Sequence, residues 1–460
     1  MYRLVYDLIV IGGGPAGYHA AARAGKAGLS VLMVEKNKVG GICLNEGCIP
    51  SKAFLHSAKI YSNINNALKY GIKIEADASY LQANVVERKD KIVKKLFNAI
   101  EYLLKSSNVQ QLFGEATIRG RVNNFFEIDV DQKTYMGSRL LIATGSEMDI
   151  PYIKGLEESF KSGYAMTSKE VFHLDTVPAS LLIIGGGAVG LEMACYFNAI
   201  GSKVTVIDCQ DSIASFFDKD MAEVLHKIYK KKGVDIYLNS RVKEIRESSV
   251  LIESRGDEVV LTPENVLVCT GRKPKIKGLG LESLGIRMEN GNVCVDSKCR
   301  TNVENVYAAG DVNGKYMLAH VAYREADVCI NDMIGKNDTI SYNSIPNIIF
   351  GNPEAALAGE TENTAVQKGI EYKKVLIPMQ YSGRFVVENE PGNEMCKILV
   401  DTKTKSLIGM QMIGSYVSEI IYGVAALIEK GCTVDEIERF IFPHPTVSEV
   451  IKQGLQEFDW

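Results

Sequence analysis

Short runs of Val, Ile and Leu recur along the chain, and two of them lead directly into a glycine-rich stretch. The first is YDLIVIGGGPAG at residues 6–17, and the second is SLLIIGGGAVG at residues 180–190. Unbroken apolar runs of this length are typical of strands buried on both faces of a parallel sheet. A helix-like segment follows each run, and then a second strand ends in an acid, SVLMVE at Glu35 and KVTVID at Asp208. The pattern predicts an α/β fold that contains two βαβ units.

Both glycine stretches match the G-x-G-x-x-G pattern of dinucleotide-binding folds, and in both the acid lies 23 residues after the first glycine. Glycine permits a tight turn and close approach of backbone to a pyrophosphate, the helix N-terminus offers free N–H groups, and the carboxylate accepts hydrogen bonds from ribose. The alternative is a pair of glycine turns without ligands, which the repeated spacing disfavours. Two dinucleotide sites are therefore predicted, with Gly12, Gly14, Gly17 and Glu35 in the first and Gly185, Gly187, Gly190 and Asp208 in the second.

The second site is predicted to prefer NAD over NADP. Asp208 would repel a 2′-phosphate, and the following stretch, CQDSIASFFDKD, contains no Arg that would accommodate one.

Composition and charge exclude several classes of function. The chain has 460 residues, of which 46% are hydrophobic and 23% charged, and its formal net charge is −4. Without a Lys/Arg block, nucleic-acid binding is not expected. Without an apolar run of membrane-spanning length, membrane insertion is not expected either. The ten cysteines are scattered rather than arranged as a secreted disulfide framework, so the predicted location is the cytoplasm.

Two cysteines, Cys43 and Cys48, lie close together in VGGICLNEGCIPSK, residues 39–52. Three interpretations compete: a zinc site completed by Cys294 and Cys299, a pair of inert buried thiols, and a redox-active disulfide. Lys52 and a nearby helix start would lower a thiol pKa, which favours reactive cysteines. On an ideal helix, residues five apart have Cα atoms about 8.6 Å apart, beyond the reach of a disulfide at about 7 Å. A bridge therefore needs irregular backbone near Cys43, which Gly40 and Gly41 would allow.

These motifs together resemble the pyridine nucleotide–disulfide oxidoreductases, and within them most closely the dihydrolipoamide dehydrogenases. The resemblance covers essentially the whole chain. LLIATGSEMDIP and VLVCTGRKP are similar to the family's strand–turn segments, VYAAGDVNGKYMLAHVAYREA to its second flavin-contacting motif, IPNIIFGNPEAALAGETE to the start of its dimer-interface domain, and FPHPTVSEV to its catalytic His–Glu segment.

The resemblance implies cofactors, partners and residue roles. FAD would occupy the first dinucleotide site and NAD the second. Cys43 and Cys48 would form the redox disulfide, with Cys48 facing the flavin, while His444 and Glu449 would act as an acid–base pair. Partners would be a second copy of the chain and a lipoyl-carrying protein of a 2-oxoacid dehydrogenase or glycine cleavage complex. No metal is expected. Further cofactor-site residues carried over from the family are Lys52 paired with Glu192, Gly145, Gly271 and Asp311.

Four domains are predicted from the positions of these motifs. They are an FAD-binding domain with the cysteine pair at 1–148, an NAD-binding domain at 149–274, a central domain that completes the FAD site at 275–340, and an α+β dimer-interface domain with the histidine at 341–460. The expected fold is thus α/β, with two Rossmann-like domains and a C-terminal α+β dimerisation domain.

Several residues depart from the family pattern or remain ambiguous. Ile42 stands where Thr is usual, Glu46 where a small apolar residue is usual, and Ala188 where a larger residue often covers the nicotinamide pocket. His320 has two interpretations, a flavin and interface residue or a hydrogen-bonded core histidine. Cysteines outside the two near pairs are interpreted as small buried hydrophobic residues: Cys195, Cys209, Cys269, Cys329, Cys396 and Cys432.

Two other functions remain open from the sequence. One is a related NAD(P)H-dependent reductase of another small disulfide. The other is a flavoprotein that serves mainly to assemble a larger complex.

Overall fold

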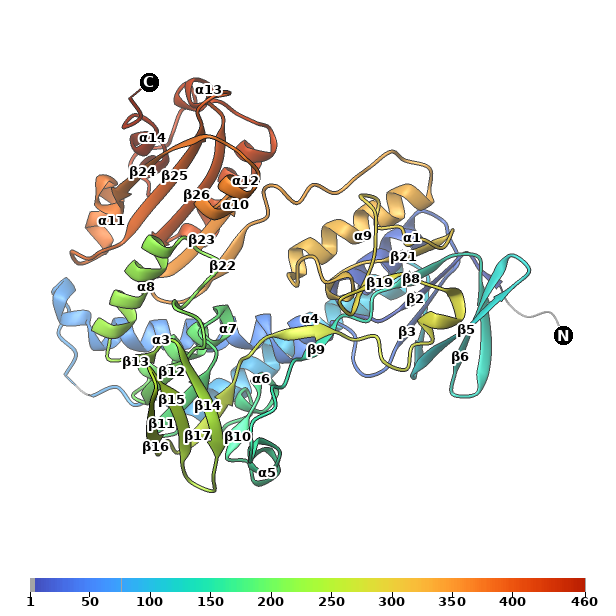
Figure 1. Cartoon of the computed structure of the whole chain (residues 1–460), viewed down its shortest axis with the longest axis horizontal. Helices are drawn as coiled ribbons and strands as arrows, with labels where there is room; N and C mark the ends of the chain where they lie inside the picture. The colour runs from blue at the N-terminus through green and yellow to red at the C-terminus, as the bar shows by residue number, and fades with distance from the viewer. Residues whose placement is uncertain (1–4, 76, 460) are drawn as a thin grey trace. The chain divides into compact units, whose positions relative to one another are not determined.

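The computed structural model describes residues 5–75 and 77–459, and its contacts divide the chain into two compact units (Figure 1). The first unit contains the chain up to Ala53, Glu87–Ile150 and Gly271–Ser341; the second contains Phe54–Val86, Pro151–Thr270 and the chain from Tyr342 onward. In the described part of the chain, no helix is long and apolar enough to cross a membrane. Each unit contains one of the predicted βαβ motifs.

The first unit is built on a five-stranded parallel sheet in the order β21-β8-β2-β3-β4. Its strands are β2 (Leu8–Ile11), β3 (Val31–Glu35), β4 (Val109–Phe113), β8 (Leu140–Ile142) and β21 (Val306–Ala308). All four residues of β2 are buried, as its unbroken apolar sequence predicts. Helices α1 (Pro15–Lys26) and α9 (Ala319–Met333) pack against each other, and Figure 1 shows them beside this sheet. The first predicted βαβ motif is confirmed.

Smaller elements surround this sheet. A four-stranded sheet has the order β1-β7-β6-β5, and two antiparallel ribbons pair β9 with β18 and β19 with β20. The remaining elements whose residues lie wholly or partly in this unit are β1 (Val5–Tyr6), α2 (Gly41–Glu46), α3 (Cys48–Asn65), α4 (Gln82–Ser106), β5 (Ala116–Val122), β6 (Phe125–Val130), β7 (Lys133–Gly137), β9 (Ser146–Met148), β18 (Arg272–Pro274), η2 (Leu281–Leu284), β19 (Met288–Glu289), β20 (Asn292–Val293) and η3 (Asp311–Asn313).

The second unit begins with another five-stranded parallel sheet, in the order β10-β17-β11-β12-β13. Asp208 follows directly after β12, so the second predicted motif is also confirmed. A three-stranded antiparallel sheet, β14-β15-β16, belongs to the same unit. The elements are η1 (Ala67–Tyr70), α5 (Leu156–Ser162), β10 (Ala165–Met166), α6 (Ser168–Val171), β11 (Ser180–Ile184), α7 (Ala188–Ala199), β12 (Lys203–Ile207), α8 (Lys219–Lys231), β13 (Asp235–Tyr237), β14 (Ser240–Ile245), β15 (Val250–Ser254), β16 (Asp257–Leu261) and β17 (Asn265–Val268).

The C-terminal part of the second unit is an antiparallel sheet in the order β22-β23-β26-β25-β24, with helices packed on it. This arrangement confirms the predicted α+β architecture, whereas the four predicted domain boundaries stay predictions. The elements are β22 (Asn347–Ile349), β23 (Glu354–Gly359), α10 (Glu362–Gln367), β24 (Tyr372–Pro378), η4 (Met379–Tyr381), α11 (Gly383–Glu388), β25 (Met395–Asp401), β26 (Leu407–Gly414), α12 (Val417–Glu429), α13 (Val434–Glu438) and α14 (Glu449–Leu455).

A buried ion cluster joins this antiparallel sheet to the helix α8 region. Lys397 on β25 is completely buried, and its Nζ lies 3.0 Å from Asp218 Oδ2 and 2.7 Å from Asp220 Oδ1 and also contacts Glu362. Burial alone would raise the pKa of Glu362, but hydrogen bonds from Lys374, Lys397 and Tyr372 lower it to about 2. The three acids lie close enough together to hold a metal ion, but the ammonium group of Lys397 provides the positive charge beside them.

We expect Lys397→Met to destabilise the protein by about 3–5 kcal/mol, because it leaves the buried carboxylate of Asp218 and the partly buried ones of Asp220 and Glu362 without their counter-charge. Urea unfolding measures the change, and Lys374→Met, which removes an exposed partner of Glu362, is the control with an expected loss of about 1 kcal/mol or less. Since the folded-state pKa of Glu362 lies below the unfolded value of about 4.3, its stabilisation is complete above that pH and is lost as the pH falls towards 2. Equal losses in the two variants would contradict the prediction.

Candidate active site

The first glycine loop connects β2 to α1 and is held by Glu35. Glu35 Oε2 accepts a hydrogen bond from Gly13 N at 2.6 Å, which ties the loop to the end of β3. Gly12 has a φ of +107°, and a Cβ there would lie 2.2 Å from the carbonyl oxygen of Ala143. The N-cap of α1, Gly14, provides no side-chain cap. The helix N–H groups are thus left for an anion, as a pyrophosphate site requires.

The second glycine loop repeats this construction between β11 and α7. Asp208 Oδ2 accepts from Gly186 N at 2.6 Å, and a Cβ on Gly185 would lie 2.4 Å from the carbonyl oxygen of Cys269. Gly187, the N-cap of α7, provides no side-chain cap, and a Cβ on it would meet no atom within 4 Å. Open space therefore lies in front of the helix N-terminus, which fits a second dinucleotide.

The third glycine of each motif has a packing role. A Cβ on Gly17 would lie 1.8 Å from the oxygen of Gly12, and one on Gly190 would lie 1.9 Å from that of Gly185. Only glycine allows each helix to pack this close to its own loop.

A polar network in the first unit surrounds Asp311. Ser146 Oγ donates to Asp311 Oδ2 at 2.5 Å, and Arg272 donates to Ser146 through Nε at 2.7 Å and through Nη2 to its carbonyl oxygen at 2.9 Å. Burial raises the pKa of Asp311, against the lowering effect of Ser146 and Arg272. Gly145 and Gly271 immediately precede the paired strands β9 and β18, which bring these side chains together.

A hollow beside Glu35 extends the first site. Its lining combines the glycine loop with lysines from a segment about 240 residues away: Ile11, Gly12, Val34, Glu35, Lys36, Gly114, Glu115, Ala116, Thr144, Lys275, Lys277, Gly278 and Leu279. An uncapped helix N-terminus, a carboxylate and adjacent cations suit the phosphates and ribose of a dinucleotide such as FAD.

Cys43 and Cys48 form a disulfide, with their Cα atoms 4.6 Å apart. With their sulfur atoms bonded to each other, the two cysteines are neither zinc ligands nor free thiols in this structure. The expected irregular backbone is present at Gly40 and Gly41, with φ values of +98° and +59°, but it lies at the start of helix α2, and the helix break between the two cysteines is at Gly47. A Cβ on Gly47 would lie 3.1 Å from the oxygen of Ile42, so the backbone passes close to the preceding helix there. Helix α3 then begins at Cys48 itself, as the predicted nearby helix start requires.

His444 and Glu449 are paired as predicted. His444 Nδ1 lies 2.9 Å from Glu449 Oε1, while Glu449 Oε2 accepts from Thr446 N at 2.9 Å. The hydrogen bond from Thr446, and next that from His444, lower the pKa of Glu449. The His444 side chain is 80% exposed. An ionised Glu449 that accepts Nδ1–H leaves Nε2 as a proton acceptor on an accessible ring.

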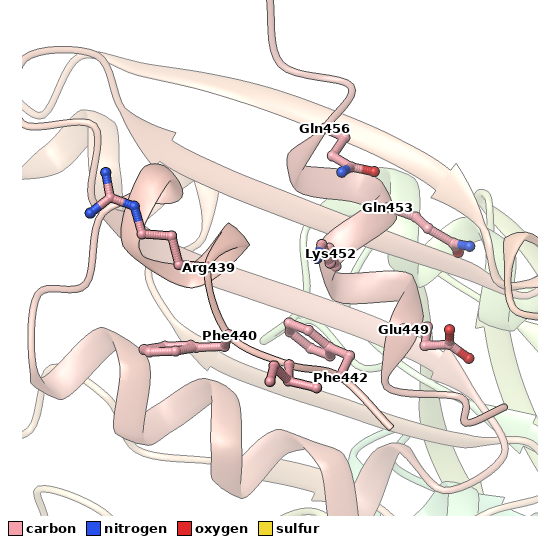
Figure 2. A pocket seen from close by; sticks show the side chains of 8 residues that line it. Arg439, Phe440, Phe442, Glu449, Lys452, Gln453 and Gln456 are labelled. Atoms are coloured by element: carbon pink, nitrogen blue, oxygen red, sulfur yellow. The ribbon is translucent and has the colours of Figure 1, made fainter. Parts of the chain in front are cut away.

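Glu449 also lines a pocket of about 310 Å³ that sequence reasoning missed (Figure 2). Figure 2 shows Phe442 near the start of helix α14, where Glu449 lies, and Phe440 pointing away from that helix. Ile441 in the same lining is 97% exposed. The complete lining is Arg439, Phe440, Ile441, Phe442, Glu449, Lys452, Gln453 and Gln456. Nothing in the sequence pattern alone marks these residues, because they meet across two helix ends.

Other expectations had mixed outcomes. His320 is exposed, so its interpretation as a core histidine is wrong. Cys209 is exposed, unlike the buried hydrophobic residue we expected, because it follows the end of β12 in the loop after Asp208.

Lys52 belongs to the first unit and Glu192 to the second, where Glu192 accepts from Phe350 N at 3.1 Å. Their pairing stays a prediction.

Comparison with known protein families identifies the fold. Residues 6–326 match the model of the pyridine nucleotide-disulphide oxidoreductases, and residues 345–454 match the dimerisation domain of the same family. The chain belongs to this family. As a member of it, the chain has FAD and NAD as its cofactors, and its dimerisation domain supports a homodimer.

The similarity to known relatives extends over nearly the whole chain. Dihydrolipoyl dehydrogenase of Geobacillus stearothermophilus is 36% identical, with 98% of this chain and 95% of the relative covered. Dihydrolipoyl dehydrogenase of Mycoplasma genitalium is 33% identical, with 97% of each covered. Among solved structures, the HOCl-induced flavoprotein disulfide reductase RclA from Escherichia coli has a TM-score of 0.84 at 27% identity, with 99% of this chain and all of that chain covered.

Proposed function

We propose that the protein is a dihydrolipoyl dehydrogenase, which oxidises dihydrolipoyl groups to the cyclic disulfide and reduces NAD⁺ to NADH. The observation that carries this proposal is the Cys43–Cys48 disulfide, within a family member that also has a paired His444 and Glu449. Full-length relatives with this activity in their names support the choice of substrate. The substrate would be carried by a lipoyl-bearing protein, and the reducing cytoplasm is the proposed location.

The chain's own residues would carry out the dithiol–disulfide exchange. His444 Nε2 accepts the proton of one substrate thiol, and the thiolate attacks Cys43 Sγ. The Cys43–Cys48 bond breaks, and Cys48 leaves as a thiolate at the N-terminus of α3, where the helix dipole stabilises it. The second substrate thiol then attacks the mixed disulfide and releases Cys43 with the cyclic product. Two electrons thus remain on the cysteine pair.

The two cofactor sites would supply the remaining chemistry. When bound, FAD would supply the acceptor for the electron pair and NAD⁺ the acceptor for hydride. The first loop, with Glu35 and Asp311, would hold FAD, and the second loop, with Asp208, would hold NAD⁺. Each loop is fixed by its own acid, so both sites are preorganised for the dinucleotide.

A steady-state assay of the FAD-loaded enzyme tests the proposal. Dihydrolipoamide with NAD⁺ should support turnover, whereas reduced glutathione with NAD⁺ should not. A higher kcat/KM in the reverse direction with glutathione disulfide than with lipoamide would instead favour the related reductase. Absence of turnover with any small thiol would favour the role in complex assembly.

We expect the enzyme to select NADH over NADPH by about a hundredfold or more in kcat/KM, because Asp208 would place its charge against the 2′-phosphate. Reduction of the bound flavin in stopped flow compares the two nucleotides directly. Asp208→Asn should lower the ratio of kcat/KM for NADH over NADPH, because the variant lacks the repelling charge. Asp235→Asn, at the neighbouring strand β13, is the control that should leave this ratio unchanged. Equal rates with NADH and NADPH in the unmodified enzyme would contradict the prediction.

A further inference from the structure

The loop between the two cysteines contains one ionisable side chain, Glu46. Glu46 is the last residue of helix α2 and lies three residues after Cys43. Side chains three apart on a helix are neighbours, with Cβ atoms about 5–6 Å apart. The disulfide closes residues 43–48 into a covalent ring, and Glu46 is one of the residues of that ring. Its position on the helix therefore makes the Glu46 side chain a neighbour of the Cys43 side chain.

The surroundings of Glu46 connect it to the network around Asp311. Arg272 on β18 is held by Ser146, which also donates to Asp311. Burial lowers the pKa of Arg272, while the carboxylates of Asp311 and then Glu46 act in the opposite direction. Glu46 is half-buried and thus partly shielded from water. Its negative charge is felt more strongly there than it would be on an open surface.

The second cysteine has a different electrostatic environment. Cys48 is the first residue of α3, where the helix dipole favours a negative charge. Lys52 follows four residues later on the same helix, so its side chain neighbours that of Cys48. The two sulfur atoms therefore differ: one has a carboxylate beside it, and the other has a helix N-terminus and a lysine.

We propose that Glu46 sets how readily the Cys43–Cys48 disulfide is reduced, because its negative charge disfavours a thiolate at Cys43. Reduction of the disulfide takes up two electrons and two protons and gives two thiols, which ionise to an extent that depends on nearby charge. Glu46 keeps the proton on Cys43 and leaves Cys48 as the preferred thiolate. The carboxylate also makes the disulfide harder to reduce than it would be with a neutral residue at position 46. This inference rests on the proposed redox role of the pair but not on the identity of its substrate.

Redox equilibration of the FAD-loaded enzyme tests the inference. The enzyme and its Glu46→Gln variant are equilibrated at pH 8 with mixtures of reduced and oxidised dithiothreitol, trapped with a maleimide, and analysed by mass spectrometry of the peptide that contains Cys43 and Cys48. We expect the equilibrium constant for reduction of the pair to rise about threefold to tenfold in Glu46→Gln, since one nearby negative charge is removed. Glu46→Asp, which keeps the charge, should stay within about twofold of the unmodified enzyme.

An exposed carboxylate of the same unit provides the matched control. Glu304→Gln removes one negative charge away from the cysteine loop and should leave the equilibrium constant unchanged. An unchanged constant in Glu46→Gln, or an equal rise in Glu46→Asp, would overturn the electrostatic role of Glu46 while leaving the proposed function intact. If the pair in the unmodified enzyme does not exchange with dithiothreitol at all, the proposed function fails, and this inference fails with it.

Discussion

Replacing Cys48 with Ser should lower dihydrolipoamide oxidation by about 10³-fold or more, because Cys48 is the leaving group of the exchange and no disulfide would remain for the substrate thiolate to attack. Cys43 would keep its thiol but would have no partner sulfur with which to form the bridge seen in the structure. Bound FAD should be retained, since the glycine loop, Glu35 and Asp311 do not depend on the cysteine. Steady-state turnover and the flavin content of the purified variant measure the two expectations separately.

Cys294→Ser is the matched control for this variant. Cys294 belongs to the same unit, forms no disulfide and is one of the two cysteines in the other near pair of the sequence. Its replacement should leave turnover within about twofold of the unmodified enzyme, as expected for a residue outside the reacting groups. Substantial turnover by Cys48→Ser would mean that the bridge seen here is not the catalytic one.

The two nucleotide loops could be predicted because their determinants are local. A strand, three glycines and a helix follow one another within about 20 residues, and the third glycine of each motif is required by a contact inside that segment, such as Gly17 against the oxygen of Gly12. The acid at the end of the next strand was found by its spacing alone. The structure places Glu35 and Asp208 on equivalent amides, those of Gly13 and Gly186.

Features that depend on distant parts of the chain could not be predicted in this way. Lys397 meets Asp218 and Asp220 from nearly 180 residues away, and nothing in its own strand marks it as a buried cation. The backbone break at Gly47 was also missed, although glycine precedes Cys48 in the sequence. The two glycines before Cys43 do have the predicted irregular backbone, in the left-handed region, but only the fold shows that a second helix break, at Gly47, separates the two cysteines.

His444→Gln should lower turnover with dihydrolipoamide by about 10²–10⁴-fold, the usual range for a positioned acid–base group. The reason is that glutamine cannot accept the substrate thiol proton, although it can still donate to Glu449. Oxidation of NADH by an artificial dye acceptor moves no thiol proton and should change little. His173→Gln, at an exposed histidine of the same unit, is the control. A variant slowed equally in both assays would indicate a structural role for His444.

The same variant can test whether each active site is shared between the two subunits of the dimer, as the resemblance to the family implies. Cys48→Ser and His444→Gln proteins, each inactive alone, are mixed under conditions that exchange subunits. In a mixed dimer with shared sites, one site has both replacements and the other has Cys48 from one chain and His444 from its partner. Half of the dimers are mixed at full exchange, so activity should return to about a quarter of that of the unmodified enzyme, by the symmetry of an isologous dimer. If subunit exchange is demonstrated and no activity returns, His444 of one chain does not act on the cysteines of the other chain, and the active sites are not shared.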